Sequence, residues 1–108
     1  MFKQYKIVTY SFLNEATANG NSLTVQIPSG DRTVEAFITG TGTVSATITW
    51  YGCNTNRNTN GKLLATTTLS GTTSDGSGGV VTESWPYMYC VLSAISGTGA
   101  KVTATVGN

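Results

Sequence analysis

Apolar and polar residues alternate along most of this chain, a period typical of β-strands that bury one face and expose the other. In residues 44–50, for example, apolar residues on one face alternate with serine and threonine on the other. The strands expected from this period cover residues 5–13, 23–27, 34–39, 44–50, 63–69, 80–84, 87–96 and 101–106. About eight short strands at even spacing predict an all-β fold, an antiparallel β-sandwich or jelly roll.

Glycine-rich segments lie between several of the expected strands and predict tight connections. Gly40–Thr43 is expected to close a hairpin between the strands on either side of it, and Gly97–Gly99 to turn the chain before the last strand. The segment 72–79 mixes glycine with serine, threonine and aspartate, so we expect a flexible loop there. The segment 87–96 is apolar on both faces, which favours a place in the middle of a sheet or at an interface.

Charge and length limit the classes of partner and the number of domains. Six Lys and Arg residues against five Asp and Glu residues give the 108-residue chain a net charge of +1. Binding to nucleic acid or to an anionic membrane surface needs a basic patch, so neither partner is expected. The first residues lack the apolar stretch of a signal peptide, and no apolar run is long enough to cross a membrane. We expect one domain over residues 1–108 that is not exported, with residues 1–13 as an N-terminal strand or arm.

The chain contains no histidine, which removes most of the common catalytic and zinc-binding arrangements. A glycosidase-like pair of carboxylates is the remaining catalytic option, and it requires two acids that face each other. Asp75 stands in a serine- and glycine-rich segment that could offer oxygens to calcium, although a plain turn is the favoured interpretation. The acidic residues are Glu15, Asp31, Glu35, Asp75 and Glu83. We therefore expect no catalytic residue, no cofactor and no metal site.

Cys53 and Cys90 are the two cysteines, and they could form either a disulfide or two packed thiols. An immunoglobulin-like bridge needs a tyrosine two residues before the second cysteine, where this chain has Met88. It also needs a tryptophan well before that cysteine, whereas Trp85 lies only five residues before it. Because no export signal is evident, we expect both thiols to be reduced and packed.

Aromatic residues and an asparagine-rich loop supply the candidate binding surface. Trp50 has the parity of the inward row that precedes it, so it is expected in the core. Tyr87 and Tyr89 lie on the face opposite Met88, where a protein interface and the rim of the core are both open interpretations. Residues 54–61 form a polar loop whose asparagines could bond to a partner or simply turn the chain. The candidate partner-binding residues are Tyr87, Tyr89, Asn54, Asn56, Arg57 and Asn58.

Four motifs in order resemble those of small all-β virion proteins of tailed bacteriophages. They are Ile48–Asn54, Leu64–Thr72 with its Ser-Gly-Thr turn, the Trp-x-Tyr segment Trp85–Tyr89, and the terminal hairpin Ala94–Val106. The resemblance covers residues 33–107. The chain departs from the family in its Asn-Thr-Asn-Arg loop, where many relatives have Asp-Gly, and at Met88 or Tyr89, where relatives have arginine. Partner contacts at those positions are therefore not carried over from the family.

The resemblance implies a non-catalytic structural protein that decorates the capsid exterior as a cement protein. Its partner would be the phage major capsid protein, whose subunit contacts it would stabilise in virions assembled in the host cytoplasm. A homo-oligomer, a dimer or trimer, is also expected, because strand edges and apolar faces need to be covered. The alternatives are a carbohydrate- or receptor-binding β-sandwich module of a phage tail and a head-tail junction component.

Overall fold

The computed structural model describes residues 8–108, which form six strands in one antiparallel, hydrogen-bonded sheet. The bounds are β1 (Thr9–Ala16), β2 (Gly20–Asn21), β3 (Val25–Gln26), β4 (Arg32–Cys53), β5 (Lys62–Val81) and β6 (Tyr87–Gly107). The path through the sheet is β1-β6-β4-β5, and both β2 and β3 also pair with β6. The described residues include no helix long and apolar enough to cross a membrane.

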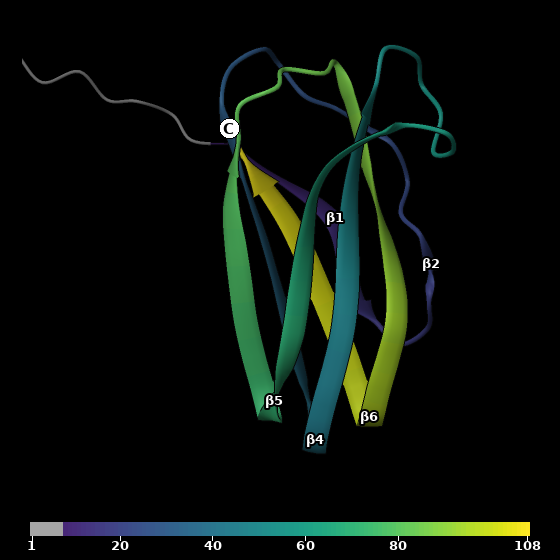
Figure 1. Ribbon diagram of the computed structural model, residues 1–108, viewed down its shortest axis with the longest axis vertical. Coiled ribbons are helices and arrows are strands. Elements are labelled where there is room, and N and C mark those ends of the chain that lie inside the picture. Colours follow the sequence, from purple (N-terminus) through teal and green to yellow (C-terminus); the bar gives the residue numbers. More distant parts are fainter. Residues whose placement is uncertain (1–7) are drawn as a thin grey trace, which may run out of the picture.

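Each of the three long strands bends near its middle and runs through two layers (Figure 1). The first half of β4 pairs with the second halves of β5 and β6, as Thr39 does with Ser74. Its second half pairs with their first halves, as Trp50 does with Cys90. A register shift between Thr39 and Thr43 marks the bend. The two halves of the sheet therefore face each other as an antiparallel β-sandwich, which confirms the predicted fold class.

Because of these bends, two of the expected connections differ from the observed ones. The sheet also has fewer and longer strands than the eight short ones expected. The hairpin predicted across Gly40–Thr43 is wrong, because the flanking segments are successive halves of β4 that pair with other strands. The segment Gly97–Gly99 likewise forms the bend of β6. Positive φ angles at Gly42 (72°) and Gly97 (125°) let the backbone turn these corners. A corner between layers and a hairpin turn both favour glycine and other turn-forming residue types. Composition alone therefore does not show which of the two a segment forms.

The loop predicted at 72–79 is also wrong, because most of this segment is the second half of β5. The segment pairs with β4 in an unbroken register from Ser74 to Val81. A Cβ atom on Gly78 would lie 2.3 Å from the carbonyl oxygen of Val34, so glycine permits a close approach of the two backbones. The glycines that predicted a flexible loop therefore belong to a strand.

Three further strand boundaries differ from the expected ones. Within the described residues β1 begins at Thr9, and residues 5–7 of the expected strand lie outside the described part of the chain. The strand expected over 23–27 shrinks to the two residues of β3, and Leu23 is 81% exposed. The segment 80–84 contributes only its first two residues, as the end of β5.

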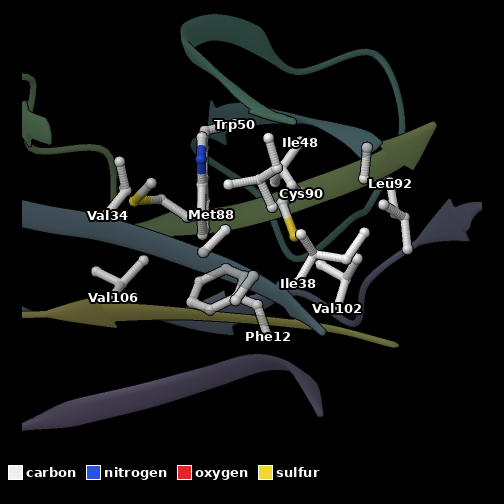
Figure 2. Close-up of a cluster of buried hydrophobic side chains, with 14 of the residues drawn as sticks. Phe12, Val34, Ile38, Ile48, Trp50, Met88, Cys90, Leu92, Val102 and Val106 are labelled. Carbon is white, nitrogen blue, oxygen red and sulfur yellow. The ribbon is translucent and has the colours of Figure 1, made fainter. Parts of the chain in front are cut away.

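The core lies between the two layers and is built from inward-facing rows of the long strands (Figure 2). Trp50 is fully buried, which confirms its predicted place in the core. Phe12 of β1 packs against it edge to face, with ring centroids 5.5 Å apart. The other buried residues of the predicted rows are Ile27, Val34, Ala36, Ile38, Val44, Ala46, Ile48, Thr67, Leu69, Val102, Ala104 and Val106. Because full burial of a large apolar side chain contributes roughly 1.5–3 kcal/mol, these rows hold the layers together.

Candidate partner-binding surface

The predicted partner-binding residues gather at one end of the sandwich, where the segment 54–61 joins β4 to β5 (Figure 1). This loop folds back over Tyr89 of β6. The Gly61 N–H donates a hydrogen bond of 2.8 Å to the hydroxyl oxygen of Tyr89, and Tyr89 is only 2% exposed. Tyr89 therefore supports the loop from below, and its ring is not an open surface.

A stacked pair of tyrosines forms the platform under the loop. The rings of Tyr51 and Tyr89 are nearly parallel, with an interplanar angle of 12° and centroids 5.1 Å apart. The two residues lie directly opposite each other in the ladder between β4 and β6. Tyr87, two residues earlier on β6, is half-buried opposite Cys53. Tyr51 was missed by sequence reasoning, although its parity opposite Trp50 placed it on this outer face.

Arg57 holds the loop together from within. Its Nε donates to the carbonyl oxygen of Thr59 at 3.0 Å, and one terminal nitrogen donates to that of Asn60 at 3.2 Å. The other terminal nitrogen contacts the hydroxyl of Thr55. The side chain is exposed, yet its donors are directed back at its own loop. Its role in the described structure is therefore to fix the shape of the loop, and a contact with a partner stays a prediction.

Asn58 ties the loop to the N-terminal part of the chain. Its Nδ2 donates to the carbonyl oxygen of Ser22 at 3.2 Å, and its own carbonyl oxygen accepts from Nδ2 of Asn21 at 2.8 Å. Since these residues are more than thirty positions apart in sequence, local patterns gave no sign of the contact. The loop is thus anchored both to the strand below it and to the segment beside it.

Asn54 and Asn56 are exposed on this anchored loop. Neither side chain makes a hydrogen bond to another described residue, so both amides are open to a partner. A shallow pocket of about 370 Å³ lies beside the loop. Its lining residues are Asn21, Tyr51, Thr59, Asn60, Gly61, Tyr89 and Val91. The predicted residues therefore do come together, but only some of them face outward.

The two cysteines are free, buried and directed to different surroundings. Cys90 belongs to the core between the layers (Figure 2), whereas Sγ of Cys53 lies 3.4 Å from the carbonyl oxygen of Arg57 in the loop. Cys53 pairs with Tyr87, so about 10 Å of strand separates it from Cys90, beyond the roughly 7 Å limit between bridged Cα atoms. Burial raises the pKa of Cys90 to about 12, which makes it a packing residue and a poor nucleophile.

The acidic side chains are spread over the surface. Glu83 accepts two hydrogen bonds from Nζ of Lys62, at 2.7 and 2.9 Å, and this contact lowers its pKa. Asp75 accepts a bond of 2.9 Å from the Ser70 N–H and lies on β5, not in a loop. Residues 8–108 contain no group of three or more His, Cys, Asp or Glu side chains placed to hold a metal ion.

Arg32 is a buried charged side chain that the sequence did not single out, and it is only 1% exposed. Its donors reach the carbonyl oxygens of Pro28 at 3.0 Å, Gly30 at 3.3 Å and Trp85 at 2.9 Å, and the sulfur of Met88 at 3.4 Å. Removal from water lowers its pKa. Since the whole guanidinium is used inside the protein, Arg32 fastens two connecting segments and is not an anion site.

No family model matches the sequence, and no curated protein matches it either. Solved structures offer weak likenesses. A chain of infectious bursal disease virus, Gx strain, has a TM-score of 0.47 and 10% identity, over 94% of this chain and 31% of that chain. A chain of the VP2 subviral particle of infectious bursal disease virus has a TM-score of 0.46 and 8% identity, over 94% and 32%.

A third likeness is to Arthrobacter globiformis T6 isomalto-dextranase complexed with panose. Its TM-score is 0.42 and its identity 13%, over 89% of this chain and 17% of that chain. This chain thus spans about a third or less of the length of these solved chains. At such identities and TM-scores, the likenesses carry no inference about activity or partners.

Proposed function

We propose that this chain is a non-catalytic structural protein of a phage virion, which binds the capsid exterior as a decoration protein and stabilises contacts between coat subunits. The observation that carries the proposal is the anchored loop 54–61, with its exposed amides at Asn54 and Asn56. The resemblance of residues 33–107 to small phage virion proteins also supports it.

Anchoring of the loop favours binding because ordering a flexible surface costs about 0.5–1.5 kcal/mol for each side chain that is immobilised. Here the bonds of Arg57 and Asn58 have already fixed the loop before a partner arrives. The exposed amides are uncharged and can both donate and accept hydrogen bonds. A net charge of +1 adds little long-range attraction, so moderate salt should weaken binding only slightly.

The non-catalytic part of the proposal rests on the chemistry of the side chains. The chain has no histidine, and Cys90 has a pKa raised away from the reactive range. Glu83 is engaged by Lys62, and Asp75 accepts from the backbone of Ser70. Both carboxylates are thus engaged in structural contacts. A general acid or base has to reach a proton of its substrate, and neither group is placed for that role.

A carbohydrate- or receptor-binding module of a phage tail is the second candidate. The observation that favours it is the shallow pocket beside the loop, where the ring of Tyr51 lies next to the amide residues Asn21 and Asn60. Sugars are commonly held by such combinations of an aromatic ring and polar groups. A head-tail junction component is a further alternative, and it predicts few copies in each particle.

The test is to add the purified chain to expanded capsids of its phage that lack it. Saturable binding in many copies, with a higher melting temperature for decorated particles, is the expected result, because a ligand that binds only the assembled lattice stabilises it. Equal melting of decorated and bare capsids, or a few copies at one vertex, would overturn the cement role. Binding that free oligosaccharide abolishes would instead favour the tail module.

The double variant Asn54→Ala/Asn56→Ala tests the surface itself. Both side chains are exposed, so the variant should fold and melt as the native chain does while its affinity for capsids falls about tenfold or more. Asn14→Ala is the matched control, because Asn14 is an exposed asparagine on β1, away from the loop. If Asn14→Ala lost as much affinity for capsids, the effect of the double variant would not be evidence that the loop contacts the capsid.

A further inference from the structure

One long edge of the sandwich has no partner among the described residues. β5 is last in the strand order, and it pairs only with β4 over its whole length. Its other side presents unpaired backbone N–H and C=O groups, which are a template for another strand. In Figure 1 the second half of β5, drawn in green, forms the outer border of its layer.

The second half of β5 lacks the features that usually protect an edge. It contains no proline and no lysine, and its one carboxylate, Asp75, accepts a hydrogen bond from Ser70. At the opposite edge of the same layer, β1 carries two register shifts and a positive φ of 51° at Glu15. Such irregularities discourage edge-to-edge pairing at β1, whereas the second half of β5 pairs with β4 from Ser74 to Val81 without a register shift.

This part of β5 also carries a protruding side chain and a matching groove. Val80 is 66% exposed, and Phe37 on the neighbouring strand is 42% exposed. Gly76 lies directly opposite Phe37, and because Gly76 and Gly78 have no side chains, a groove runs along this face. By the two-residue period of a strand, Val80 points to the same face as Gly76 and Gly78.

We propose that a second copy of this chain pairs with the second half of β5 as an antiparallel strand, related by a two-fold axis at Gly78. In that register Val80 lies opposite Gly76 of the other copy, where its side chain fills the groove beside Phe37. A two-fold axis satisfies both copies at once, because Val80 and Gly76 stand two residues to either side of Gly78. This self-complementarity identifies a second copy, in preference to an unrelated strand, as the occupant.

Charge and space are compatible with this pairing. The nearest outward charge is Glu35, opposite Gly78, and across the axis the two copies of Glu35 would be separated by three strand spacings, about 14 Å. Screening at physiological salt, with a Debye length of about 8 Å, makes their repulsion small. Since Gly78 has no side chain, none stands on either copy at the proposed axis.

This pairing rests on the proposed function in one respect: it assigns a surface to the homo-oligomer expected of such a decoration protein. Its test needs no capsids. Sedimentation velocity of the native chain over a range of concentrations should show dimers. Val80→Lys removes the protruding side chain and adds a charge to the edge, so the dimer should be lost. Leu63→Lys is the control, because Leu63 is an exposed apolar residue, 55% accessible, in the other half of β5. It should leave the dimer intact.

A cross-linking experiment tests the register. In the double variant Gly76→Cys/Val80→Cys, about 13 Å of strand separates the two thiols within one chain, too far for a disulfide. Across the proposed axis each new cysteine faces its counterpart, so mild oxidation should give a covalent dimer on a non-reducing gel. A Cβ at position 76 has room, since its nearest neighbour is Cβ of Phe37 at 3.8 Å. Either single variant should stay uncross-linked.

A native chain that sediments as a monomer at every concentration would overturn the inference. So would a dimer that survives Val80→Lys, or a double variant that forms no covalent dimer. These results leave capsid binding untouched, because that is measured on decorated particles and depends on the loop at the end of the sandwich. Conversely, a dimer that fails to bind capsids would overturn the proposed function alone.

Discussion

The indole Nε1 of Trp50 donates a hydrogen bond of 3.1 Å to the hydroxyl oxygen of Thr67, in the interior of the sandwich. Trp50 is fully buried and Thr67 is 5% exposed, so the bond satisfies a polar group that has no access to water. Thr67 lies on β5, while the ring of Phe12 from β1 packs against the same indole. Trp50 thus joins strands from both layers.

Truncation of Trp50 should be severe for so small a domain. Trp50→Ala removes the largest fully buried side chain among residues 8–108 and should cost about 3–5 kcal/mol of unfolding free energy, enough to unfold much of the population. Urea denaturation followed by circular dichroism measures the loss. If the variant kept native stability and lost only partner binding, the assignment of Trp50 to the core would be wrong.

The hydrogen bond itself can be isolated by a double-mutant cycle. Thr67→Val leaves the indole N–H buried without an acceptor and should cost about 1–3 kcal/mol. Trp50→Phe/Thr67→Val should cost less than the two single variants summed, because neither partner is then left unsatisfied. Strict additivity in urea denaturation would show that the bond contributes nothing.

Replacing Arg32 with a residue that has fewer hydrogen-bond donors should destabilise the protein. Arg32→Met leaves the carbonyl oxygens of Pro28, Gly30 and Trp85 without their side-chain partner and should destabilise the protein by about 2–4 kcal/mol. Arg32→Lys should recover little, because an ammonium group does not reproduce the planar fork of donors. Thermal unfolding of both variants is the measurement. Full rescue by lysine would show that charge, not geometry, is what the site requires.

Cys90 should make stability depend on pH in the alkaline range. Burial raises its pKa from the ordinary 9.0 to about 12, so above pH 9 the unfolded chain releases a proton that the folded protein keeps. The contribution of the neutral thiol is complete below pH 9 and is lost as pH rises toward 12. Urea midpoints between pH 8 and 11 should therefore fall more steeply for the native chain than for Cys90→Ala. Parallel curves would contradict the raised pKa.

Gly52 should be intolerant of even one added methyl group. A Cβ there would lie 2.5 Å from Cγ of Trp85, so the indole has to move. Gly52→Ala should cost about 1–3 kcal/mol and shift the tryptophan fluorescence. Gly20→Ala is the matched control, because nothing lies within 4 Å of its Cβ position. Its effect should stay within about 0.5 kcal/mol.

Much of the architecture follows from the local period of the chain. Alternation placed Val34, Ile38 and Ile48 on inward rows, and the same parity placed Trp50 among them. This works because successive side chains of a strand point to opposite faces whichever strand pairs beside it. The gathering of Asn54, Asn56, Arg57 and Asn58 in one loop was also predictable, since they are close in sequence. Tyr87 and Tyr89 join them only because β6 pairs with β4.

The tertiary structure decided what depends on partners distant in sequence. Gly40–Thr43 forms a corner because β4 pairs with β5 and β6 in both layers. Most of the segment 72–79 is a strand because its backbone pairs with β4. Tyr89 is covered because Gly61 folds back over it. The free edge of β5 exists only because no described strand follows it in the sheet order. Pairing brings together residues that are far apart in the chain, and a local period carries no information about which strands will meet.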